Sequence, residues 1–150
     1  MKKRIRWLPA VLAVLLLLLL ADPAYRLNVR RLDRSMEAIQ GDTVSLNELV
    51  PFRWDTAYTF SPYASRKEMA AAMGVPVSRR IPETVSEGMT QLIFLRDGRV
   101  VCAVCGYPDS LGWRMEFTHW DGGAACVTYR ENPRFSVKRD GGVVTLTQLE

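Results

Sequence analysis

The chain of 150 residues has little of the chemistry that most enzymes need. It contains one histidine, His119, and three cysteines, Cys102, Cys105 and Cys126. A zinc site takes four ligands, and these few imidazole and thiol groups have no spacing that gathers them. No serine stands in a nucleophile-elbow context, and no glycine-rich loop could hold a phosphate. We therefore predict a protein that is not an enzyme, with no catalytic residues, no metal and no other cofactor.

An excess of positive charge is absent beyond the N-terminal region. Residues 1–40 contain 8 Lys/Arg against 3 Asp/Glu, a net charge of +5, whereas residues 41–150 contain 12 against 13, a net charge of −1. Nucleic-acid binding depends on clustered basic side chains that neutralise phosphates. We therefore expect no nucleic-acid partner for residues 41–150.

One long apolar run is present at residues 7–21, with six consecutive leucines at 15–20 and four basic residues directly before it. A helix that is apolar on every face suits a bilayer, and residues 5–25 would span about 30 Å, the thickness of its hydrocarbon core. We predict that residues 1–25 form a membrane anchor, with a cleaved signal peptide as the alternative. The leading basic residues place the N-terminus in the cytoplasm and the domain outside the cell membrane.

Residues 26–40 carry apolar side chains at Val29, Leu32, Met36 and Ile39, which is the spacing of one helical face. Arginines surround this stripe. We predict a juxtamembrane amphipathic helix that rests on the following domain, touches anionic lipid headgroups, or does both.

Residues 41–150 alternate short β patterns with turn signals, and they contain one clear helix. A Ser-x-x-Glu capping box at residues 65–68 opens that helix, and Gly74 ends it. The dipeptide Asp97-Gly98 predicts a tight hairpin between strands at 91–95 and 99–105, both apolar enough to be covered on two faces. Further strands are expected at 54–60, 113–119, 124–130, 134–138 and 143–147. The predicted fold is an α+β domain in which a strand and a helix pack on an antiparallel meander of five or six strands.

A set of motifs within residues 48–147 resembles a group of small secreted or membrane-anchored proteins of Firmicutes-type bacteria. The most specific motif is Trp-Asp-x-x-Tyr-x-Phe-x-Pro-Tyr at residues 54–63, and Leu-Ile-Phe at 92–94 and Gly-Tyr-Pro at 106–108 add to it. The resemblance implies an extracytoplasmic α+β domain held by an N-terminal signal or anchor. It implies no catalytic residue.

The densest aromatic cluster is Trp54, Tyr58, Phe60 and Tyr63. On a regular strand the first three share one face, where they would form core against the helix. The alternative is an aromatic groove for a peptide or glycan, with Asp55 as its polar contact. Asp55 points away from Trp54 on such a strand, so bonding to the amides of a neighbouring turn is its other role.

The loop at residues 75–90 has a basic pair at its centre, which is either a solvated loop tip or an arm that binds a partner. The candidate binding residues are Trp54, Asp55, Tyr58, Tyr63, Arg79 and Arg80. We expect the partner to be an envelope protein or a peptide. The alternatives are an envelope hydrolase that uses His119 and Asp121, and a regulatory domain tethered on the cytoplasmic side.

The spacing Cys102-x-x-Cys105 resembles a redox motif, but it lies in a strand pattern, where residues three apart point to opposite faces and are too distant to bond. Two alternatives are open for the thiols. Cys126 forms a disulfide with Cys102 or Cys105, or all three cysteines are reduced and buried.

Overall fold

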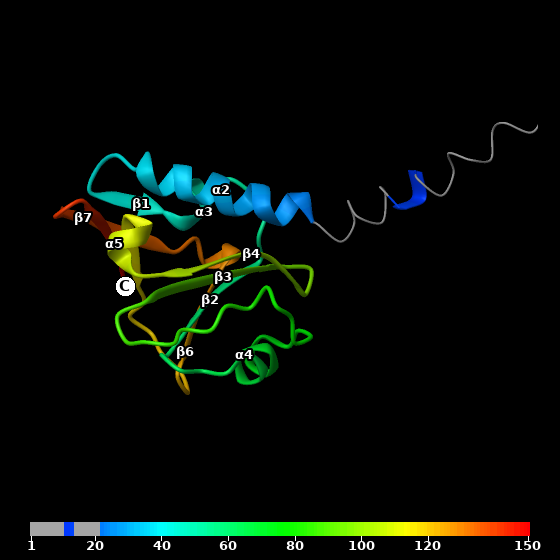
Figure 1. Ribbon diagram of the computed structural model, residues 1–150. Coiled ribbons are helices and arrows are strands. Elements are labelled where there is room, and N and C mark those ends of the chain that lie inside the picture. Colours follow the sequence, from blue (N-terminus) through cyan, green and yellow to red (C-terminus); the bar gives the residue numbers. More distant parts are fainter. Residues whose placement is uncertain (1–10, 14–21) are drawn as a thin grey trace, which may run out of the picture.

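The computed structural model describes residues 11–13 and 22–150 (Figure 1). Its helices and strands are α2 (Pro23–Glu37), β1 (Thr43–Ser45), α3 (Leu46–Leu49), β2 (Thr56–Phe60), α4 (Arg66–Met73), β3 (Thr90–Arg96), β4 (Arg99–Gly106), α5 (Pro108–Leu111), β5 (Trp113–Glu116), β6 (Ala124–Thr128), the 3-10 turn η1 (Tyr129–Glu131), β7 (Arg134–Asp140) and β8 (Val143–Gln148). They build two four-stranded sheets with few helices, which confirms the α+β class.

The predicted membrane anchor lies largely outside the described residues and stays a prediction for residues 5–21. Its predicted end at residue 25 does not agree with the structure, because Pro23–Glu37 form α2 and Tyr25 Oη donates to the Ala103 carbonyl of β4. Within the described part, no helix combines the length and the apolar character that crossing a bilayer requires.

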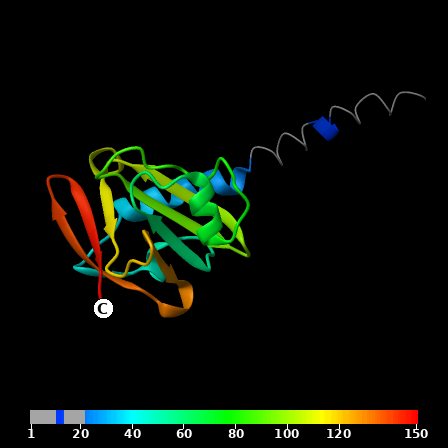
Figure 2. The same ribbon diagram turned by 90° about the horizontal axis from the view of Figure 1, so that it is seen from below.

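The central sheet has the strand order β4-β3-β2-β6, and every neighbouring pair in it is antiparallel. The β3–β4 hairpin forms where the sequence predicts it, and Asp97 and Gly98 have φ angles of 49° and 69°, as a type I′ turn requires. Helix α2 lies on one side of this sheet and α4 on the other (Figures 1 and 2). Consecutive residues of β3, such as Ile93 and Phe94, are therefore buried on opposite faces of the sheet.

The second sheet has the order β1-β7-β8-β5, so the prediction of one continuous meander is wrong. Strand β5 pairs in parallel with β8, whereas β6, the next strand in the chain, pairs with β2 in the central sheet. Between them Phe117 turns into the core, and its carbonyl accepts a bond from Trp120 Nε1 at 2.9 Å. Alternating polarity identifies the buried face of a strand but not its partner, so the local pattern could not reveal this crossing between sheets.

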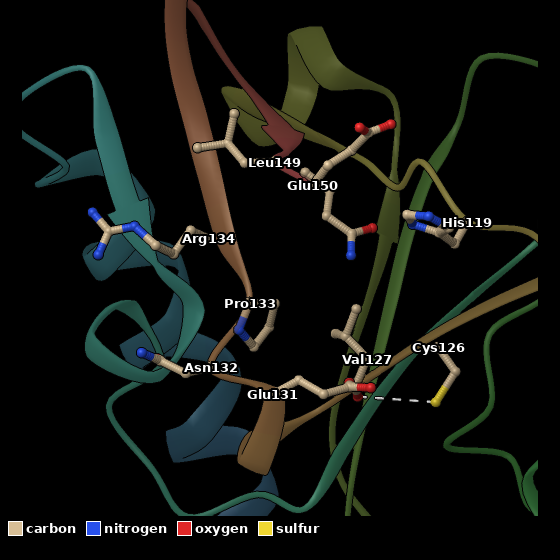
Figure 3. Close-up of a pocket in the computed structure, with 10 residues that line it drawn as sticks. His119, Cys126, Val127, Glu131, Asn132, Pro133, Arg134, Leu149 and Glu150 are labelled. Carbon is tan, nitrogen blue, oxygen red and sulfur yellow. Dashed lines mark hydrogen bonds between the residues drawn. The ribbon is translucent and has the colours of Figure 1, made fainter.

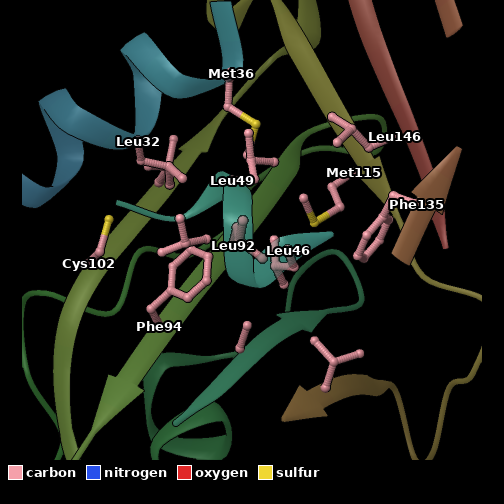
Figure 4. Close-up of a cluster of buried hydrophobic side chains, with 14 of the residues drawn as sticks. Leu32, Met36, Leu46, Leu49, Leu92, Phe94, Cys102, Met115, Phe135 and Leu146 are labelled. Atoms are coloured by element: carbon pink, nitrogen blue, oxygen red, sulfur yellow. The ribbon is translucent and has the colours of Figure 1, made fainter. Parts of the chain in front are cut away.

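The larger hydrophobic core lies between α2 and the two sheets (Figure 4). Leu32 from α2, Phe94 from the central sheet and Phe135 from the second sheet are each fully buried there. A smaller core lies on the opposite face of the central sheet, where Met69 of α4 packs with Ile93. The central sheet is thus covered on both sides, as its apolar strands predict.

Helix α2 also covers an edge of the central sheet. Strand β4 is that edge, and its outward carbonyls at Val101 and Ala103 accept bonds from Asn28 Nδ2 at 3.1 Å and Tyr25 Oη at 3.3 Å. An edge strand with unpaired carbonyls is a template for unwanted pairing with another chain. The amphipathic helix predicted from the sequence is therefore present as part of the folded unit, with Leu32 buried beneath it.

The connection from Gly74 to Met89 is held to the sheet rather than free. The Ser65 capping box and the left-handed Gly74 begin and end α4 as predicted. Farther along the connection, Ile81 is completely buried. Gln91, 3% exposed, donates to the Pro82 carbonyl at 2.6 Å and accepts from the Phe60 amide at 3.1 Å. Such a paired buried amide anchors the connection on the central sheet.

Candidate functional site

The residues singled out by the sequence do not form one site. Strand β2 begins at Thr56, so Trp54 precedes it and belongs to the larger core, whereas Tyr58 and Phe60 lie with the smaller core on the other face. The expectation that these three aromatic residues share a face is wrong, because a regular alternation does not extend back through residues 54 and 55. Tyr63, 65% exposed, lies after the strand in a left-handed conformation.

Trp54 and Asp55 remain together in an open groove of about 600 Å³. We call this surface the Trp54 groove. It is lined by Asn47, Val50, Pro51, Phe52, Arg53, Trp54, Asp55, Arg96, Asp97 and Tyr129. Three segments that are distant in the sequence thus contribute to one hollow, and aromatic and proline side chains are prominent in it. Such a composition suits an extended peptide segment.

Aromatic edge-to-face contacts build the floor of the Trp54 groove. Trp54 packs against Phe94 with ring centroids 5.6 Å apart, and Phe52 packs against the same ring at 5.3 Å. Tyr129 packs on Trp54 at 5.4 Å and is 49% exposed, so it forms the outer wall. Trp54 is only 3% exposed, since Tyr129 covers it on one side and the core on the other.

A hydrogen-bond donor and an acceptor in the Trp54 groove have no partner among the described residues. Trp54 Nε1 and Asn47 Oδ1 are both buried, and neither forms a hydrogen bond within the chain. Asn47 Nδ2 donates to the Tyr129 carbonyl at 2.8 Å, which orients its amide and leaves the oxygen as the free group. An unpaired buried polar group is costly and calls for an explanation. One donor and one acceptor are what a peptide unit needs for its carbonyl and its N–H.

Most charged residues of the groove form hydrogen bonds or ion pairs within the domain, and one is exposed to solvent. Asp55 Oδ2 accepts from the Asp97 amide at 2.7 Å, which is the role at a neighbouring turn that the sequence suggested. Arg96 pairs with Asp97 at 3.3 Å. Arg53 is exposed and forms no ion pair with any residue that the structure describes. It is therefore the charge at the rim that could meet a bound partner.

The basic residues Arg79 and Arg80 of the loop have different surroundings. Arg80 pairs with Asp22 at 2.6 Å and lies over the Tyr25 ring, 5.4 Å from its centroid. It thus fastens the loop to the first turn of α2, while Arg79 is exposed. Burial raises the pKa of Tyr25, and the neighbouring Cys102 adds to this effect, so the tyrosine stays a neutral donor toward β4 at physiological pH.

The residues of the hydrolase alternative line a smaller pocket of about 400 Å³, together with Tyr58 and Cys126. His119 Nδ1 lies 3.0 Å from Thr118 Oγ1, and no hydrogen bond of the described residues joins His119 to Asp121. Although the residue is exposed, partial burial of its sulfur raises the pKa of Cys126, which favours the thiol over the nucleophilic thiolate. A base oriented by a carboxylate and an activated nucleophile are thus both missing from the described arrangement, so it offers no geometric support for a hydrolase.

Another pocket, of about 550 Å³, lies between β6 and the end of β8 (Figure 3). His119 and Cys126 lie on one side of it, and Asn132 and Arg134 lie on the opposite side. Its wall includes the chain's last residues, Leu149 and Glu150. Within the described part of the chain, no cluster of three His, Cys, Asp or Glu side chains could hold a metal ion here or elsewhere.

The three cysteines are free in the structure, so it does not contain the disulfide of the first alternative, and the second alternative, three reduced and buried thiols, holds for burial only at Cys102. Cys102 and Cys105 lie on β4 and Cys126 lies on β6, which are opposite edges of the central sheet. Three strand spacings separate these edges by about 14 Å, twice the reach of a disulfide. Of the three, only Cys102 is fully buried, and Cys126 is exposed.

Sequence reasoning missed three groups of the Trp54 groove. Asn47 and Phe52 are not among the candidate residues, and Tyr129 falls within the strand expected at residues 124–130. A signal for Tyr129 is present, since Thr128 and Glu131 have capping-box spacing and form the cap of η1. That turn ends β6 and places Tyr129 over Trp54.

No known protein family, no curated protein and no solved structure matches the chain.

Proposed function

We propose that the chain is a single-pass membrane protein whose domain lies on the extracytoplasmic side of the membrane. The domain binds an extended peptide, or an extended segment of an envelope protein, in the Trp54 groove. The apolar run at residues 7–21, with basic residues before it, supports the attachment to a bilayer. The unpaired Trp54 Nε1 and Asn47 Oδ1 support the binding role, and they are the observation on which it depends.

The proposed binding step needs only a side-chain movement. Tyr129 is held by its backbone, since its amide donates to the Asp55 carbonyl at 2.9 Å, while its ring is half exposed and only packs on Trp54. We expect a small movement of this ring to admit a peptide carbonyl to the indole N–H while the ring stays a wall of the groove. The aromatic walls would then pack on the peptide side chains, as in domains that recognise extended proline-containing segments.

Selection of peptides from a random library, with the full chain held in lipid nanodiscs, tests the binding role. Tyr129→Ala should weaken a selected peptide at least about tenfold, which corresponds to about 1.4 kcal/mol. Tyr107→Ala is the matched control, because Tyr107 is 48% exposed and does not line the groove. Equal affinities for the two variants, or no selected peptide at all, would refute the proposal.

The position of the domain relative to the membrane has its own test. Cys126 is exposed, so a membrane-impermeant maleimide added to intact cells should label it. Labelling only after permeabilisation would place the domain in the cytoplasm and favour the regulatory alternative.

A further inference from the structure

The face of α2 that points away from the domain is basic. The exposed arginines on it, which we call the arginine face, are Arg26, Arg30, Arg31 and Arg34. At 3.6 residues per turn they fall within about 140° of the helix circumference, opposite the buried Leu32 and Met36. Leu27, 45% exposed, lies among them. None of the four arginines forms an ion pair with another residue of the described chain.

Two acidic side chains of the helix offset only part of this charge. Asp33 is half-buried beside the face. Glu37 is exposed in the last turn, at an angular position between those of Arg26 and Arg30, so four arginines stand against two carboxylates. The arginine face therefore keeps an excess of positive charge along most of its length, whereas residues 41–150 carry a net charge of −1.

The direction of α2 is set by the domain, since the chain leaves helical geometry just before it. Asp22 caps α2 in a left-handed conformation, with φ 37° and ψ 73°, and Pro23 follows as the first helical residue. Arg80 holds the Asp22 carboxylate, and Tyr25 and Asn28 bond α2 to β4. A left-handed residue before a proline interrupts a helix, so α2 begins at Pro23.

We propose that the arginine face lies along a bilayer surface rich in anionic phospholipid, so that α2 runs parallel to the membrane. Guanidinium groups bind phosphate oxygens in bidentate fashion, and anionic headgroups attract basic segments next to a membrane anchor. Leu27 would enter the interface between the arginines. This inference rests on the membrane attachment proposed above, because the apolar run ends at residue 21, next to the first turn of α2.

The geometry makes the proposal testable by distance. A 15-residue helix is about 22 Å long, so an α2 that stands upright would carry Ala38 about that far from the bilayer, whereas one lying flat keeps Ala38 near the headgroups. The exposed Ala24 and Ala38 at the two ends accept a cysteine-linked fluorophore, as Ala24→Cys and Ala38→Cys, in a full chain with Cys105 and Cys126 changed to Ser. Lipids with a nitroxide headgroup then quench a fluorophore that lies at the surface.

In vesicles of phosphatidylcholine with one part in three phosphatidylglycerol, we expect the labels at 24 and 38 to be quenched alike. The triple variant Arg30→Gln, Arg31→Gln, Arg34→Gln should reduce quenching at 38 to less than half. Salt near about 1 M should do the same, since it shortens the screening length to about 3 Å. Lys67→Gln, an exposed charge on α4, is the control and should change nothing.

The remaining outcomes each overturn the proposal in a different way. Quenching at 24 but not at 38 would refute the arginine face as a lipid surface and leave the anchor standing. Quenching at neither position would refute the anchor as well. Equal quenching at 38 in phosphatidylcholine alone, or in the triple variant, would show that anionic charge does not hold the helix down.

Discussion

Helix α2 should be a structural part of the domain, and a pair of leucines within it provides a direct measure. Leu32 is fully buried in the larger core, whereas Leu27, on the same helix, is 45% exposed. Truncation of a buried leucine to alanine costs about 2–5 kcal/mol, because it removes apolar contacts and leaves a cavity. We expect Leu32→Ala to lower the free energy of unfolding by about 3 kcal/mol and Leu27→Ala to lower it by less than about 0.5 kcal/mol.

The comparison isolates packing from helix propensity. Both variants exchange leucine for alanine inside α2, so the intrinsic preference of the two residues for a helix cancels. Urea unfolding of the full chain in detergent, followed by the fluorescence of the buried Trp54 and Trp113, gives both free energies. With a slope of about 1–3 kcal/mol per molar urea, the difference moves the midpoint by about 1 M or more. Equal midpoints would refute the claim that α2 is folded onto the domain.

Two further predictions concern buried polar groups. Burial raises the pKa of Cys102 from 9.0 to about 12, and the nearby Asp33 adds to the effect. As the pH rises, the unfolded chain therefore loses the thiol proton before the folded chain does. The free energy of unfolding should fall by about 1.4 kcal/mol per pH unit between pH 9 and 12. Cys102→Ala should remove that part of the slope in alkaline denaturation, and an unchanged slope would contradict the burial of this thiol. Gln91→Leu leaves the Phe60 amide and the Pro82 carbonyl without their partner and should cost about 2 kcal/mol in thermal unfolding; a cost near zero would mean that Gln91 does not hold the connection to the sheet.

The prediction that the aromatic cluster forms core is confirmed for Trp54 and Phe60, which are buried, whereas its role as a binding groove stays a prediction. Trp54 is core, as expected for a large apolar ring, and it also lines a groove, because Tyr129 and Phe52 come to lie beside it. The sequence could not place Tyr129 there, since 75 positions separate the two residues and only the pairing of β2 with β6 brings them together. Asp55, in contrast, accepts a hydrogen bond from the Asp97 amide, which belongs to a turn that the dipeptide Asp97-Gly98 predicts by itself.

Sequence alone determined those features that depend on neighbours in the chain. The capped helix at Ser65, the I′ turn at Asp97-Gly98 and the stripe on α2 follow from bonds and contacts that close within a few residues. Tertiary structure decided the split into two sheets, the parallel pairing of β5 with β8, and the separation of Cys126 from Cys102. The physical reason is that strand polarity states which side is buried, while the choice of partner depends on how distant segments together fill one core.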